Sequence, residues 1–184
     1  MKTFFAFICV ICFGLSIWSC SKPKSYSDIP EIHFKQLLLE DRIDPLDETF
    51  KKAILNFSFI DGDGDLGVRP QDKLTPNGRI SLVHYTWFKK MSDGNYEQYI
   101  FPDPDMPNSS DIPYNSVMDK SEAQNKTLKG TIEIELSTPE NPKNVDIMYV
   151  EFWIVDREGH ESNKERSPDF SIYSEGGTII KPQK

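Results

Sequence analysis

The chain has 184 residues with 29 acidic and 21 basic side chains, a formal net charge of −8. This balance disfavours nucleic acid, because phosphates select basic patches, and it suits a cation or a neutral partner better. About 165 residues remain after the N-terminal segment described next, which is one domain with a sizeable core.

The first residues have the layout of a secretory signal peptide. Met1 and Lys2 give a positive start, and an uncharged apolar run follows from Phe4 to Ile17. That run is shorter than the ~20 residues that span a bilayer as a helix, so a cleaved signal peptide over residues 1–19 is favoured over a retained anchor. Its removal takes away only Lys2 among the charged residues, which changes the net charge to −9.

The end of this segment resembles the lipobox of bacterial lipoproteins. Ile17, Ser19 and Cys20 match its aliphatic, small and cysteine positions, and Trp18 is bulkier than usual. The resemblance implies that Cys20 becomes the first mature residue and carries lipid that holds the protein on a membrane. The alternative is an ordinary signal peptide with an incidental cysteine. No cysteine follows Cys20, so the exported domain has no internal disulfide.

Residues 20–28 are predicted to form the lipidated cysteine and a flexible, polar tether. Ser21 is similar to the residue found in outer-membrane-directed lipoproteins. Surface-exposed lipoproteins of the Bacteroides group resemble one another in an acidic run at this point. Here the tether carries Lys22 and Lys24 instead, which favours an outer-membrane lipoprotein that faces the periplasm.

Residues 29–184 are predicted to form one all-β domain. Hydrophobic residues alternate along most of it, with turn signals such as Asn77-Gly78 between the segments. A polar loop with a turn of helix near 47–51 is expected over 42–52, and a proline-rich excursion over 102–125 is a candidate partner site or a plain insertion. About seven strands suit a two-layer β-sandwich. The expected strands cover 29–39, 53–60, 79–91, 96–101, 128–136, 147–156 and 168–173, with 179–180 as an extension of the last.

The segment Val155–Asn163 resembles the last hairpin of bacterial immunoglobulin-like and fibronectin type III-like domains. Together with the lipobox and the Asp61–Gly67 loop, it is similar to uncharacterised lipoproteins of the Bacteroides group. The resemblance implies a single immunoglobulin-like β-sandwich. It names a kind of protein and no activity.

The most unusual stretch joins an apolar strand to aspartates spaced by glycines. Asp61, Asp63 and Asp65 can point three carboxylates at one centre, and such hard oxygen donors suit Ca²⁺. The pattern departs from an EF-hand, because Leu66 stands at the sixth position and Asp72 at the twelfth. The competing interpretation is a tight Gly-Asp turn without a metal ion.

Other chemistry is sparse. His33, His84 and His160 have no second histidine at metal-ligand spacing, and neither a nucleophilic cysteine nor a Gly-x-Ser-x-Gly elbow is present. Tyr85 and Trp87 are expected on one face of their strand, which favours the core over an exposed aromatic strip.

The sequence therefore predicts a non-catalytic binding or structural module of the bacterial cell envelope. Its partners would be the membrane, through lipid on Cys20, and an envelope protein or glycan. The alternatives are a carbohydrate-binding module and an enzyme that acts on envelope glycans. No catalytic or ligand-binding residue is assigned, and Ca²⁺ is the one candidate cofactor.

Overall fold

The computed structural model describes residues 25–43, 47–67, 82–106, 108–112, 126–139 and 145–182. The expected signal peptide over 1–19, Cys20 and part of the 102–125 excursion lie outside these ranges. Within them, no helix is long and apolar enough to cross a membrane.

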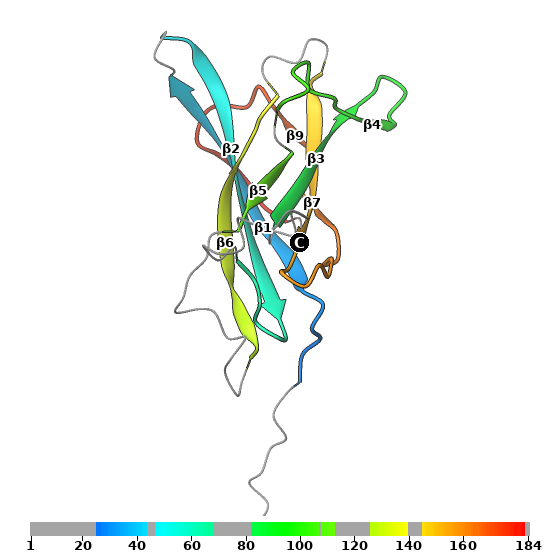
Figure 1. Ribbon diagram of the computed structural model, residues 1–184. Helices are drawn as coiled ribbons and strands as arrows, with labels where there is room; N and C mark the ends of the chain where they lie inside the picture. The colour runs from blue at the N-terminus through cyan, green and yellow to red at the C-terminus, as the bar shows by residue number, and fades with distance from the viewer. Residues whose placement is uncertain are drawn as a thin grey trace, which may run out of the picture.

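Two antiparallel sheets confirm the all-β sandwich (Figure 1). The first sheet has the order β10 (Thr178–Ile180), β1 (Glu31–Ile43), β2 (Thr49–Asp61), β6 (Leu128–Leu136). The second has the order β4 (Tyr96–Gln98), β3 (Leu82–Lys90), β7 (Ile147–Val155), β8 (Glu165–Arg166), with β5 (Ser109–Asp111) on β3 and β9 (Phe170–Ser171) on β7.

The core lies between the sheets, where the period-two alternation places apolar side chains. Leu55 and Phe57 of β2 are fully buried, and Phe59 is 3% exposed, as the alternation predicts. The ring of Phe57 contacts that of Phe152 across the sandwich, with 5.1 Å between centroids. Burying such aromatic side chains contributes the largest part of the hydrophobic stabilisation.

The first hairpin is longer and more regular than expected. β1 and β2 pair from Glu31 to Ile43, so the loop predicted over 42–52 is wrong at residues 42–43 and 49–52, which are strand, and holds at residues 47–48. The helical turn predicted near 47–51 is wrong. A register shift between Phe34 and Gln36 keeps the strand in the sheet. The extra residue of this bulge lets Leu37 and Leu39 face the core after Phe34, although Phe34 and Leu37 are three residues apart.

The C-terminal part also differs from the prediction. Residues 178–180 do not extend the preceding strand but pair with Leu37–Leu39 of β1 in the other sheet. The short β8 was not expected, and the expected strand over 168–173 is reduced to β9. The crossing from β9 to β10 depends on pairing with residues far away in the sequence, which local alternation does not encode.

Trp87 belongs to the core, as the alternation of β3 favours. Its side chain is 1% exposed, and its Nε1 donates a hydrogen bond to the carbonyl oxygen of Ser137, 2.9 Å away. The outer face of the same sheet carries stacked ring pairs instead, Phe88 on Tyr149 and His84 on Trp153.

Replacing Trp87 by alanine is expected to lower the free energy of unfolding by about 3–5 kcal/mol, because it opens a cavity and orphans a carbonyl group. Urea unfolding followed by circular dichroism measures the loss. Trp153→Ala, on the half-buried outer face, is the matched control and should cost clearly less. Equal losses for the two variants would contradict this assignment of the core.

Candidate metal centre

The candidate site lies where β2 and β7, one strand from each sheet, come to their ends. Asp61 is the last residue of β2, and Asp156 directly follows β7. Both strands end at the end of the sandwich from which the N-terminal segment leaves (Figure 1). The Asp61–Gly67 loop and the 156–160 turn therefore meet there.

Four carboxylates converge at this junction. Asp61, Asp63, Asp65 and Asp156 each offer an oxygen atom, and these atoms all lie within 4.8 Å of one another. Asp61 and Asp156 are fully buried, and Asp65 is 6% exposed. The structure thus brings together all three aspartates predicted from the sequence and adds a fourth from the opposite sheet.

Three of the four carboxylates also hold the two loops together through hydrogen bonds with backbone N–H groups. Asp61 Oδ2 accepts a hydrogen bond from the Asp65 backbone N–H, and Asp65 Oδ2 accepts one from the Glu158 N–H, both at 3.0 Å. Asp156 Oδ1 accepts the N–H groups of Gly159 and His160, at 2.7 and 2.8 Å. These bonds fix the carboxylates in place.

The remaining oxygens of the aspartate loop have no such partner. Oδ1 of Asp61, of Asp63 and of Asp65 is buried and makes no hydrogen bond with the described residues. An unpaired buried carboxylate oxygen is costly, and buried polar groups are otherwise nearly always satisfied. Three such atoms in one cluster give this junction the oxygen donors that a cation would use.

The loop is shaped for this convergence. Gly64 has φ 70°, a left-handed conformation that favours glycine and lets the chain turn between Asp63 and Asp65. Leu66 packs into the core and anchors the end of the loop. From the opposite turn, Arg157 donates hydrogen bonds to the carbonyl oxygens of Leu66 and Gly67, at 3.2 and 3.1 Å.

Without a cation, the site opposes ionisation of its own carboxylates. Burial, followed by the close approach of the Asp63 carboxylate, raises the pKa of Asp61 to about 8. Burial and repulsion by Asp156 raise the pKa of Asp65 to about 7. The charge of Asp156, and its hydrogen bond, raise the pKa of His160.

The site also contacts the last part of the segment predicted to form a tether over residues 20–28. Tyr26 and Ser27 cross directly over Gly62, where an added Cβ would overlap their carbonyl oxygens. The ring of Tyr26 lies under Lys129 Nζ of β6, 3.7 Å from the centroid. Close backbone approach, not a turn, is the reason for glycine at position 62.

Sequence reasoning missed three residues of this region, Asp156, Glu158 and His160. The sequence did hold a signal, since they alternate at the same two-residue spacing as Asp61, Asp63 and Asp65. The strand β2 precedes the loop, so the helix that would precede an EF-hand loop is absent at the described residues 47–61.

Exposed aromatic rings and carboxylates in a hollow are the groups that would suit a glycan-acting protein, and several of them contact basic side chains here. On the outer face, Arg166 covers the ring of Tyr149 at 4.0 Å, and Lys164 covers that of Trp153 at 4.4 Å. An open hollow beside β8 contains Asp169, which pairs with Arg166 at 2.9 Å. These rings and this carboxylate already have protein partners.

No protein-family model matches the chain, and neither a curated protein nor a solved structure does.

We expect the thermal midpoint in EDTA to fall as pH rises from 4.5 to 8.5. The pKa values of Asp61 and Asp65 are raised from 3.8 to about 8 and 7 in the fold, so the native state binds more protons than the unfolded chain between these values. Their stabilising protonation is complete below about pH 4 and is lost as pH rises through 7 to 8. The raised pKa of His160 acts in the same direction.

Scanning calorimetry across this pH range measures the effect. Asp61→Asn should flatten the dependence, because the amide does not ionise. A midpoint in EDTA that stays level or rises between pH 4.5 and 8.5 would contradict the electrostatic description of the site.

Proposed function

We propose that the protein is a non-catalytic binding or structural module of the bacterial cell envelope, anchored by lipid on Cys20 and stabilised by a Ca²⁺ ion. The ion would be held by Asp61, Asp63, Asp65 and Asp156. The observation that carries the calcium assignment is the set of three buried carboxylate oxygens without hydrogen-bond partners. The envelope location is supported by the signal-peptide and lipobox patterns of the sequence.

The donor set fits calcium by chemistry and by size. Carboxylate oxygens are the hard ligands that Ca²⁺ prefers, at 2.3–2.6 Å. Ligands on opposite sides of such an ion lie roughly 4.8 Å apart, and the four oxygens here lie within 4.8 Å of one another. At this separation each pair of ionised carboxylates repels by roughly 3 kcal/mol at an effective dielectric of ~20, which a divalent cation would reverse.

The surroundings favour a structural ion over a sensor. Asp61 and Asp65 come from the end of one sheet and Asp156 from the end of the other, so one ion would clamp both sheets. Several backbone N–H groups already hold the carboxylates in position. A pre-formed site of this kind changes little in shape on binding, which suits stabilisation of a domain exposed outside the cytoplasm.

The chain is also suited to being held at one end. The segment over residues 25–30 leaves the sandwich beside the candidate calcium site, and Asn163 fastens its continuation by hydrogen bonds with the N–H and C=O groups of Ile32 at 2.8 and 3.0 Å. The lipid would therefore be connected to an ordered point of the domain. The opposite end, with the hairpin tips, would face away from the membrane.

Calcium is expected to raise the thermal midpoint of the purified full-length chain in detergent by about 5–10 °C at a concentration a hundredfold above Kd. Asp61→Asn should abolish this shift, since it removes the charge of a buried ligand. The same variant should be at least as stable as the wild type in EDTA at pH 8, because it relieves repulsion. Calorimetric titration and thermal melts measure both effects.

Asp146→Asn is the matched control, since it removes an exposed carboxylate outside the site. It should keep the full calcium shift. A wild-type chain that shows neither heat nor a change in midpoint at millimolar calcium would remove the metal ion from the proposed function.

Lipid attachment is tested by growing cells with an alkyne-labelled fatty acid and reading the label on the purified chain. The wild type should be labelled, and Cys20→Ala should fall to background. Cys12→Ala, in the apolar run of the signal peptide, should keep the label. Labelling that survives loss of Cys20 would overturn the lipoprotein assignment.

A further inference from the structure

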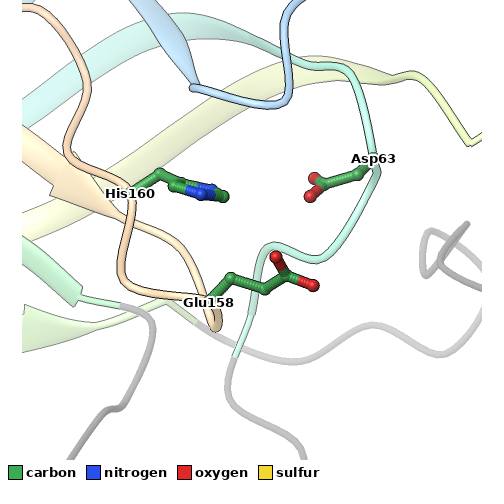
Figure 2. Close-up of side chains that lie close together, drawn as sticks. All are labelled: Asp63, Glu158 and His160. Atoms are coloured by element: carbon green, nitrogen blue, oxygen red, sulfur yellow. The ribbon is translucent and has the colours of Figure 1, made fainter.

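A second group of potential ligands lies directly beside the four carboxylates. Asp63, Glu158 and His160 each offer one ligand atom, and these three atoms lie within 4.8 Å of one another. Figure 2 shows Asp63 approaching from the aspartate loop, with Glu158 and His160 facing it from the opposite turn. Asp63 belongs to both groups.

The imidazole of His160 is held by a carboxylate, as metal-binding histidines usually are. Its Nδ1 lies 2.9 Å from Asp156 Oδ2, and its own backbone N–H is bonded to Asp156 Oδ1. A carboxylate acceptor at Nδ1 places the proton there and leaves the lone pair on Nε2. A carboxylate that fixes the tautomer in this way is the usual second partner of a metal-bound histidine.

The charge of the junction exceeds what one divalent ion neutralises. Four aspartates and Glu158 converge there, and Arg157 is the cation that bonds to the loop, through the carbonyl oxygens of Leu66 and Gly67. A single Ca²⁺ would leave an excess of negative charge on the outer side of this junction, where Asp63 and His160 are partly buried and Glu158 is exposed. The inner side of the junction holds three buried Oδ1 atoms without hydrogen-bond partners, on Asp61, Asp63 and the 6%-exposed Asp65. These atoms point to a cation on the inner side.

We propose that the junction is a two-ion centre, in which Asp63, Glu158 and His160 bind a divalent transition-metal ion of the Zn²⁺ class next to the calcium, with Asp63 as the bridging ligand. The inference rests on the proposed calcium site, because the shared carboxylate must already be held there. Imidazole nitrogen with carboxylate oxygen suits Zn²⁺, Co²⁺ or Mn²⁺, whereas the all-oxygen inner group suits Ca²⁺. The two positions are therefore selective for different ions.

The test is a calorimetric titration of the tag-free, full-length chain in detergent, stripped with EDTA and dialysed. Ca²⁺ is titrated first, and Zn²⁺ is then titrated into the calcium-saturated protein. We expect one equivalent in each step. Co²⁺ in place of Zn²⁺ should give a visible d–d absorption, which reports directly on the ion's ligands.

The variants separate the two positions. His160→Gln should weaken the zinc step by more than about tenfold, remove the cobalt absorption and leave the calcium step in place. Asp61→Asn should remove the calcium step. His33→Gln is the matched control, because His33 also lies near two glutamates, 3.2 Å from Glu31 and 3.7 Å from Glu165, but on the exposed face of β1.

Each outcome decides one of the two assignments. Calcium binding without a further zinc equivalent would overturn the second position and leave the calcium site standing. Zinc that displaces calcium, or a zinc step unchanged in His160→Gln, would also overturn it. Failure of calcium to bind would overturn the proposed function together with the two-ion centre.

Discussion

At one end of the sandwich, the carboxylates that hold two loops in place also repel one another. This end is the one where the N-terminal segment joins β1. Asp61, Asp65 and Asp156 each accept backbone N–H groups that would otherwise be buried without a partner. Neutral side chains would relieve the repulsion, but they accept these hydrogen bonds less strongly. Without a cation, protons neutralise part of this set, because the pKa values of Asp61 and Asp65 are raised to about 8 and 7. A bound cation would let all of these carboxylates ionise. Cation binding would therefore be coupled to closure of the two loops, because the same carboxylates take part in both.

The two sheets contribute unequally to this junction, so its geometry depends on how the sheets are placed relative to each other. The β2 side supplies Asp61, Asp63 and Asp65 from one short loop, so their mutual spacing is set locally. The β7 side supplies Asp156, which caps its own turn and also orients His160. A displacement of β7 relative to β2 would separate the two sets of ligands. The core contact between Phe57 of β2 and Phe152 of β7 opposes such a displacement.

Local patterns were enough to predict the strands that alternate cleanly, such as β6 and the buried face of β2, and the acidic loop that follows. The bulge after Phe34 and the pairing of Ile180 with Leu37 were not readable, because both depend on partners far away in the sequence. The same holds for the site, since Asp156 lies 91 residues after Asp65. Only the sandwich topology brings these two carboxylates together.

The route of the chain into the sandwich determines how the domain would bear a pull from the membrane. Tyr26 and Ser27 cross Gly62, and the chain continues into β1, which is hydrogen-bonded to β2 on one side and to β10 on the other. Tension along β1 would load all of its hydrogen bonds with β2 at the same time, in shear. It would not open these bonds one after another. Resistance to forced unfolding depends on the unfolding rate, which such a geometry slows. The candidate metal centre lies at the point where that tension would enter the fold. Ions bound there would hold the two loops at the base of the domain together.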